Sequence, residues 1–367
     1  MTPGDMQGFI FGAPHRYCQG PGMIDRLGEV LAPLGASTLV VVDGFVLDLL
    51  GARIAVSCAK TGVTPAIRAF DGEITYPAID ALIAGLEGQR PDAAVGIGGG
   101  KALDAAKAVA LKLGLPVVTV PTIASNDSPT SAAIAMYDDA HTMIAVDRLH
   151  RSPEAVVVDT ALIAAAPVRF LLAGIGDALS KKFEADGCLA GTGVTPFGTR
   201  PGLTGVAIAD ACYRTLRRHG AAGVAAARAG KVTADLEAVV EATLLMSGLG
   251  FENGGLSLAH SLTRGLVKVR GARDAPHGDQ IAWALLVQLA AEGRDDAFIR
   301  DVIGFHRELG LPFTLAALGM PDATAAEIAE IADWTMTAPH LRNLAAPVDA
   351  AVIAAAIKRL ETLAGHA

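Results

Sequence analysis

The hydrophobic pattern of this chain changes character once, near residue 160, and that change limits the folds the chain can adopt. Before it, short runs rich in β-branched residues alternate with segments of helical periodicity. The runs that predict buried strands are 37–43, 92–98, 115–121 and 155–159. Strands that alternate with helices predict a parallel sheet covered on both faces. Residues 133–146 predict a hairpin instead, with its turn near Asp138, Asp139 and Ala140.

After residue 160 the strand pattern stops, and long segments rich in alanine and leucine follow with a period of 3.6 residues. Prolines interrupt them at Pro196, Pro201, Pro276, Pro312, Pro321 and Pro347. The Gly-, Pro- and Thr-rich stretch 191–202 predicts a loop between two helices. We therefore expect two domains, an α/β domain over 1–162 and an all-helical domain over 163–367.

Composition supports a large, folded core and excludes some partners. Of 367 residues, 51% are hydrophobic and 19% charged, and the net charge is −8, which argues against disorder and against nucleic acid as a partner. Mean hydropathy is +0.42, yet no run has the roughly 18 uninterrupted apolar residues of a membrane span. Four scattered cysteines predict buried free thiols, and no segment has the pattern of a signal peptide, so we expect a cytoplasmic location.

The segment GIGGGKALDAAK (96–107) places three consecutive glycines and a lysine between a predicted strand and a predicted helix. Glycines let a phosphate approach the backbone, and helix N-terminal amides attract negative charge. The usual dinucleotide fingerprint does not fit the run. A P-loop fails as well, because Ala102 follows Lys101 and Val95 replaces the first glycine. The segment predicts a generic pyrophosphate cradle; the alternative is a tight turn that needs positive φ.

Two neighbouring features suit the same site. The segment PTIASNDSPTS (121–131) is rich in hydroxyl groups and carries one acid, which suits the opposite wall of a dinucleotide cleft. Asp43 ends a predicted strand, where an acid can accept hydrogen bonds from ribose hydroxyls and repel a 2′-phosphate. Asp43 could equally be an ordinary strand-end aspartate that starts a turn with Gly44.

Asp177, His260 and His277 are candidate metal ligands by their chemistry, although their spacing in the sequence does not bring them together. Each histidine lies in apolar surroundings, and Asp177 follows two glycines at a predicted helix start. One carboxylate and two imidazoles make a three-ligand zinc site with an open position. The residues alone also allow core histidines and a helix-capping aspartate.

Six collinear segments resemble one family, the glycerol dehydrogenases of the iron-containing alcohol dehydrogenase superfamily, which are relatives of dehydroquinate synthase. The resemblance runs from about residue 10 to 365. The segments are 40–46, 96–107, 120–132, 174–185, 247–260 and 277–289. It implies a Rossmann-like parallel-sheet domain followed by an all-α domain, as in dehydroquinate synthase.

The resemblance also implies roles for single residues. Asp177, His260 and His277 match the zinc ligands, while Asp127 matches a catalytic acid that meets the substrate hydroxyls, and Phe251 an apolar wall. The residues that match NAD-binding positions are Asp43, Gly99, Gly100, Lys101, Asp104, Thr122, Ser125, Ser131, Ala133 and Tyr137.

The expected activity is therefore zinc-dependent hydride transfer between a small polyol, such as glycerol or a related vicinal diol, and NAD, giving a hydroxyketone. Lys181 stands where the iron-using branch has a fourth ligand, a histidine, which favours zinc held by three protein ligands. The family pattern is not followed at three places, which are Asn126, Thr263 and the stretch GARDAP (271–276). These departures affect the identity of the substrate more than the type of reaction. Relatives commonly form homo-oligomers.

Three alternatives remain at this stage. One is a lyase of the dehydroquinate synthase type, and another is a dehydrogenase of a phosphorylated substrate, as in the glycerol-1-phosphate dehydrogenases. The lyase needs inward-facing basic residues in the helical domain, whereas helical spacing places most of the candidates at the surface; these are Lys181, Lys182, Arg264 and Lys268. The third alternative is a non-catalytic NAD-binding protein, against which the three metal-ligand candidates argue.

Overall fold

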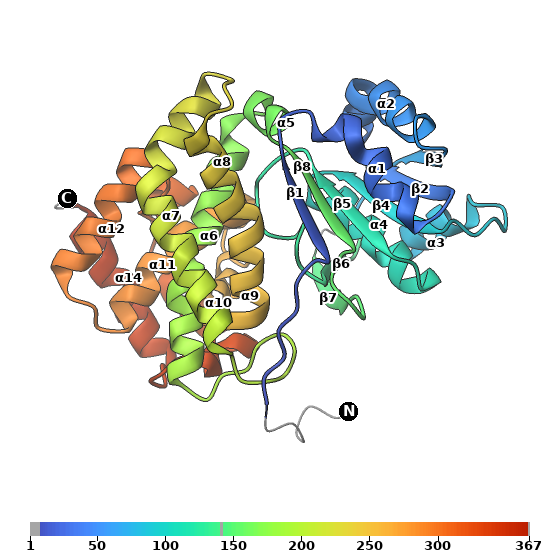
Figure 1. The fold of residues 1–367 in the computed structure, drawn as a ribbon. Coiled ribbons are helices and arrows are strands. Elements are labelled where there is room, and N and C mark those ends of the chain that lie inside the picture. The colour runs from blue at the N-terminus through green and yellow to red at the C-terminus, as the bar shows by residue number, and fades with distance from the viewer. Residues whose placement is uncertain (1–7, 140–141, 366–367) are drawn as a thin grey trace.

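The structure is a computed structural model that describes residues 8–139 and 142–365. An α/β half, coloured blue to green, lies beside a helical half coloured largely yellow to red (Figure 1). Helix α5 (Thr160–Ala165) begins directly after the last strand, and past it the described residues form helices and loops only. The predicted fold class is confirmed, and the expected division after residue 162 lies inside α5.

A six-stranded parallel sheet, in the order β1-β8-β5-β4-β2-β3, forms the centre of the α/β half. Its strands are β1 (Arg16–Gly20), β2 (Ser37–Val42), β3 (Thr64–Ala69), β4 (Ala93–Gly98), β5 (Val117–Pro121) and β8 (Ala155–Asp159). The four predicted strands correspond to β2, β4, β5 and β8. Their residues are nearly all buried because helices cover both faces of a parallel sheet.

The two edge strands, β1 and β3, lack the continuous apolar run that reveals the central four. Their residues are half-buried or exposed, and β3 carries Pro65 and Arg68. An edge strand pairs on one side only and tolerates such residues. The sheet therefore extends one strand beyond the prediction at each edge.

Side chains of the central strands alternate between the two faces of the sheet. Val40 and Val42 pack on one face against α1 (Leu27–Leu31) and α2 (Gly44–Ala59). Leu39 packs on the opposite face against α3 and α4. The bounds of the last two are α3 (Tyr76–Ala84) and α4 (Gly100–Leu113). Around α1 the helical segment is divided into three short pieces, Met23–Arg26, Leu27–Leu31 and Ala32–Leu34, and Pro33 lies in the first turn of the last of them.

The predicted hairpin is formed by β6 (Ala133–Tyr137) and β7 (Met143–Arg148), which pair antiparallel. Asp138 closes its turn: its backbone N–H donates to the Thr142 carbonyl at 2.9 Å, and its carboxylate accepts from the Thr142 N–H at 2.8 Å. Ala140, part of the predicted turn, lies outside the described residues.

The helical half packs around one large core of leucine, valine and alanine. Its helices are α6 (Val168–Ala190), α7 (Leu203–Arg228), α8 (Ala234–Glu241), α9 (Ser247–Gly254), α10 (Leu258–Leu266), α11 (His277–Ala291), α12 (Asp296–Leu309), α13 (Ala325–Thr335) and α14 (Ala350–Gly365). Helix α11 is buried over most of its length, with Trp283 fully enclosed. Residues 191–202 form the predicted connection between α6 and α7.

The remaining composition-based expectations concern thiols and membranes. Cys58, Cys188 and Cys212 are buried free thiols, as expected, whereas Cys18 is half-buried. Among the helices in the described ranges, none combines the length and apolar character that crossing a membrane requires.

Candidate metal and cofactor site

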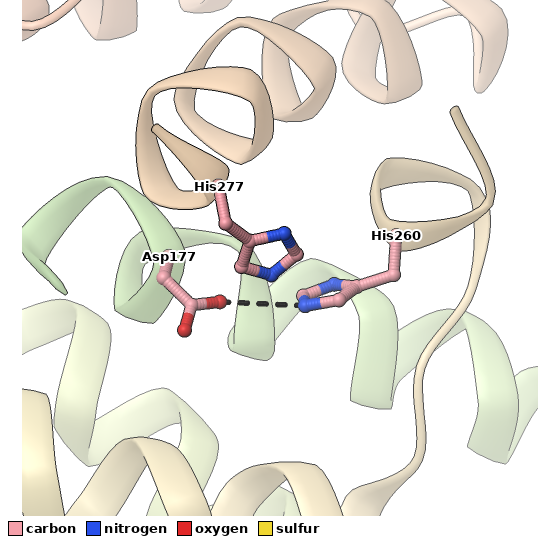
Figure 2. A group of neighbouring side chains, drawn as sticks. All are labelled: Asp177, His260 and His277. Atoms are coloured by element: carbon pink, nitrogen blue, oxygen red, sulfur yellow. Dashed lines mark ion pairs between the residues drawn. The ribbon is translucent and has the colours of Figure 1, made fainter. Parts of the chain in front are cut away.

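Asp177, His260 and His277, 100 residues apart at the extremes, converge on one point in the helical half. Asp177 lies on α6, His260 on α10, and His277 is the first residue of α11. One ligand atom from each lies within 4.8 Å of the others. Figure 2 shows the three side chains pointing toward one another from three separate elements. His277 is exposed, so the cluster has an open side.

Two glycines beside these candidate ligands allow α6 and α11 to meet. A Cβ on Gly278 would lie 1.8 Å from the carbonyl oxygen of Ala173, and one on Gly176 would lie 2.5 Å from the carbonyl oxygen of Gly278. Real Cβ atoms do not approach backbone so closely, so both positions require glycine. The close contact brings Asp177, next to Gly176, within reach of His277, next to Gly278.

Glu184 orients His260. Its Oε2 lies 2.6 Å from Nδ1 of His260, and its Oε1 accepts backbone N–H bonds from Ser257 at 2.8 Å and His260 at 3.0 Å. A proton on Nδ1 donated to Glu184 leaves the Nε2 lone pair of a neutral imidazole for a metal. Nε2 lies 3.3 Å from Asp177 Oδ1.

Burial and charge act in opposite directions on this pair. Burial opposes protonation of His260, but the carboxylates of Glu184 and Asp177 outweigh it and raise the pKa of His260 to about 8. Without a metal the imidazole therefore holds a second proton on Nε2 at neutral pH, and a metal bound there would displace that proton. For Glu184, burial favours the neutral acid, but His260, Lys181 and the Ser257 N–H lower its pKa to about 2. Glu184 is therefore an anion at neutral pH, as an acceptor for a ligand histidine should be.

Sequence reasoning missed Glu184, although the signal is present. It follows Asp177 by seven residues, two helical turns, and so lies on the same face of α6. An acid at that spacing from a metal ligand is a candidate partner for a second ligand.

Replacing Glu184 by glutamine is expected to lower zinc affinity about tenfold to a hundredfold, because His260 loses its anionic partner. The measurement is zinc transfer to a chromophoric chelator. Asp186→Asn is the control, since it removes the same charge from the same helix where the carboxylate pairs with Lys182 instead. Equal zinc affinity in Glu184→Gln and wild type would show that Glu184 does not support the ligand.

Lys181 is the unexpected member of the site. Most of the basic candidates in the helical half were predicted to lie at the surface, and Arg264 and Lys268 are exposed there. The Lys181 side chain, in contrast, is only 1% exposed. Its Nζ donates to Asp177 Oδ1 and lies 3.2 Å from His260 Nε2 and from Asp127 Oδ2. Burial opposes its charge, but the carboxylates of Asp127, Asp177 and Glu184 keep its pKa above the ordinary value.

Asp127 connects the α/β half to this cluster. It lies on the loop after β5, and its Oδ2 accepts from Ser247 Oγ of α9 at 2.9 Å besides its contact with Lys181. The carboxylate is 13% exposed. The loop predicted to form the opposite wall of the site therefore reaches the metal-ligand candidates.

The glycine-rich turn joins β4 to α4 without a side-chain cap. Gly98 ends β4 with φ of +143°, Gly99 is the N-cap of α4 and no side chain caps that end of the helix. A Cβ on Gly100 would lie 3.3 Å from Asn126 Nδ2. Lys101 is 59% exposed and its Nζ contacts Glu73 at 2.8 Å. The turn leaves the amides at the start of α4 open to an anion.

Asp104 is engaged within the fold. Its Oδ1 accepts from Lys107 Nζ at 3.1 Å and from Ser128 Oγ at 2.6 Å, and its Oδ2 accepts from the Ala135 N–H at 3.0 Å. Lys107, fully buried and not singled out by its sequence pattern, also donates to the carbonyls of Ser128 and Ala133. The two residues hold the 122–135 segment against α4. Asp104 therefore supports the expected cofactor-binding segment through hydrogen bonds within the protein.

Asp43 caps α2, which begins at Gly44, in place of the turn that the sequence allowed there. Its Oδ1 accepts the N–H bonds of Phe45 and Val46 at 3.0 and 3.3 Å. It also borders the glycine turn, since a Cβ on Gly98 would lie 3.0 Å from Asp43 Cβ. The position suits a ribose contact beside the cradle, and the capping role does not preclude one.

The other predicted residues follow the same wall. Thr122 donates its N–H to the Gly98 carbonyl at 3.1 Å, which ties the loop to the turn. Ser125 lies beyond it and Ser131 is buried, while Ala133 and Tyr137 lie on β6. Phe251 lies half-buried on α9, the helix that carries Ser247. The roles of these residues in binding a cofactor and a substrate stay predictions.

Comparisons with known proteins place this geometry in a family. The family described as iron-containing alcohol dehydrogenase matches residues 18–167. Glycerol dehydrogenase of Pseudomonas putida is 40% identical over 321 residues, which cover 88% of each chain. The chain belongs to the iron-containing alcohol dehydrogenase family. Within it, this chain is an oxidoreductase of the glycerol dehydrogenase type.

Two further relatives extend the family assignment. Glycolaldehyde reductase of Halobacterium salinarum is 38% identical over 324 residues, covering 88% of this chain and 89% of its own. The crystal structure of a probable glycerol dehydrogenase from Sinorhizobium meliloti superposes with a TM-score of 0.91 at 37% identity, covering 98% of this chain and all of the other. The two-half architecture is thus shared with this family over nearly the whole chain.

Proposed function

We propose that this protein is a zinc-dependent dehydrogenase that exchanges a hydride between a small vicinal diol and NAD. The observation that carries the proposal is the convergence of Asp177, His260 and His277 beside Asp127, at the junction of the glycine-turn half and the helical half. A metal-ligand set, a substrate-facing acid and a phosphate cradle together fit alcohol oxidation with a dinucleotide.

The donor set fits zinc. One carboxylate and two imidazoles are the ligand types of catalytic zinc sites, and Glu184 supplies the acceptor that such a histidine needs. The buried Lys181 ammonium among these residues supports the proposal, because the carboxylates of the cluster already hold one positive charge there. When bound, zinc would lower the pKa of a substrate hydroxyl, and NAD would accept the hydride.

The remaining work belongs to the chain's own residues. Exposed His277 leaves one side of the cluster open, so a substrate can reach it from the junction. Asp127, with Ser247 and Lys181 holding Oδ2, can accept a hydrogen bond from the neighbouring hydroxyl of a diol. Two anchored hydroxyls would fix the reacting carbon, which favours vicinal diols over simple alcohols.

NAD is the expected dinucleotide rather than NADP. The N-terminus of α4 would hold the pyrophosphate through backbone N–H groups. Asp43 lies beside that turn, and its negative charge opposes a 2′-phosphate on the adenosine ribose.

The proposal is tested with a substrate panel. Protein stripped of metal and reloaded with zinc is assayed for NADH formation with glycerol, 1,2-propanediol and 2,3-butanediol. Phosphorylated analogues and NADP are compared, and glycolaldehyde is tested with NADH in the reverse direction. Net NADH formation from a diol supports the proposal if the reaction requires zinc. Failure with every diol rejects it, and turnover of a phosphorylated substrate without net NADH would indicate a lyase.

The two roles of Asp43 can be separated by two substitutions. Asp43→Ala is expected to lose about 1 kcal/mol of unfolding free energy with the cap, whereas Asp43→Ser keeps a capping oxygen and most of that stability. Both substitutions remove the negative charge beside the expected ribose. Both should therefore raise the KM for NAD and reduce the enzyme's preference for NAD over NADP. Thermal unfolding and cofactor kinetics measure the two effects. An unchanged KM in Asp43→Ser would leave Asp43 as a cap only.

A further inference from the structure

Lys181 occupies the position at which the iron-using branch is expected to have its fourth metal ligand, and its side chain turns into the cluster. The ammonium is fully buried and has three partners, Asp177, Asp127 and His260. It follows Asp177 by one helical turn, so α6 directs both side chains to the same place. A buried ammonium so enclosed is a fixed charge of the site.

The atoms that Lys181 contacts are the ones a metal needs. His260 Nδ1 is engaged with Glu184, which leaves Nε2 as its metal-binding nitrogen. Lys181 Nζ lies 3.2 Å from that nitrogen and donates to Asp177 Oδ1, and the nitrogen and Oδ1 lie 3.3 Å apart. A metal ion and the ammonium therefore compete for the same two atoms.

The charges around the site explain why a cation is built in. The carboxylates of Asp127, Asp177 and Glu184 gather around the one ammonium of Lys181, all in largely buried positions. Buried anions without a counter-charge are costly and repel one another. Once a divalent ion is present, the same ammonium becomes a like charge beside it and weakens its binding.

We propose that Lys181 is an internal cation that holds the ligand cluster together in the metal-free protein and lowers the affinity of the site for zinc. The inference rests on the proposed zinc-dependent function. Asp177 and His260 would hold zinc when it is bound, and Lys181 would keep Asp127 as its carboxylate partner. Lys181 is thus a positioning residue that makes the metal exchangeable and restrains the substrate-facing acid.

The test compares Lys181→Met with Lys182→Met. Lys182 is the next residue, half-buried, and pairs with Asp186 and Asp210 away from the cluster. Zinc affinity is measured by competition with a chromophoric chelator, and the unfolding temperature is measured for the metal-free protein. Lys181→Met is expected to bind zinc at least about tenfold more tightly. Its metal-free form should unfold at a lower temperature than wild type, while Lys182→Met keeps the zinc affinity of wild type.

The opposite signs of the two effects separate this role from simple packing, because a damaged core would weaken zinc binding and stability together. If metal-free Lys181→Met does not fold, the rate of zinc release from the zinc-loaded variant gives the same comparison. Lys181→Gln keeps hydrogen-bond donors without the charge, and its zinc affinity gives a second comparison with wild type. Zinc held no more tightly by either variant overturns the proposal. Wild-type protein that binds zinc but oxidises no diol would instead reject the dehydrogenase function, and wild type that binds no zinc would reject both.

Discussion

Replacing His277 by alanine is expected to leave the protein folded but unable to retain zinc, and to lower kcat/KM with a diol by about a thousandfold or more. The reason is that a two-ligand remnant of Asp177 and His260 binds zinc poorly. The several kcal/mol that the ion contributes to stabilising the alkoxide are then lost, at about 1.4 kcal/mol for each factor of ten. His277 is exposed at the start of α11, so its removal leaves no buried cavity.

Metal content by elemental analysis and NADH formation measure the effect together. His219→Ala is the matched control, because that histidine lies on α7 and pairs with Asp235 at 2.8 Å, apart from the cluster. Normal zinc content and a normal rate in His277→Ala would disprove the metal assignment. Loss of both in His219→Ala would indicate general damage to the helical half.

The second large effect is expected at a residue that cannot touch zinc. Gly278→Ala would place a Cβ 1.8 Å from the carbonyl oxygen of Ala173, and no side-chain rotation can relieve a clash with backbone. Helix α11 must then move away from α6, which separates His277 from Asp177. We expect a loss of about 3 kcal/mol in unfolding free energy together with loss of zinc, since overpacking of a core contact typically costs 1–3 kcal/mol.

Gly304→Ala is the control for this experiment. Gly304 lies inside α12, and a Cβ there would meet no atom within 4 Å. The same substitution should stabilise the protein there by about 1 kcal/mol, because alanine is the better helix former. Thermal unfolding and zinc content of the two variants test the argument. Wild-type stability and metal content in Gly278→Ala would show that the helix contact does not set the ligand geometry.

Local pattern was sufficient for the centre of the sheet and for the class of the second half. The apolar runs of β2, β4, β5 and β8 are visible because both faces of those strands are buried. Strands β1 and β3 were missed because edge strands need no such run. The periodicity of the later segments predicted helices, but it says nothing about which helices pack together.

The site divides in the same way. The glycine turn and the three metal-ligand candidates were named from residue types and from the family resemblance. Lys181 and Glu184, four and seven residues after Asp177, could have been placed on its face of α6 by helical spacing. That spacing does not say whether the face is buried, so Lys181 was grouped with residues expected mostly at the surface.

By itself the chain's order of residues determined where strands give way to helices, where the backbone can approach a phosphate, and which side chains can ligate a metal. These properties depend on neighbours within one or two turns. Only the tertiary structure decided that Asp177, His260 and His277 meet, that Glu184 orients one of them, and that an ammonium lies among them. The physical reason is that contacts across 83 or 100 residues depend on close helix packing, here at Gly176 and Gly278, which no local pattern encodes.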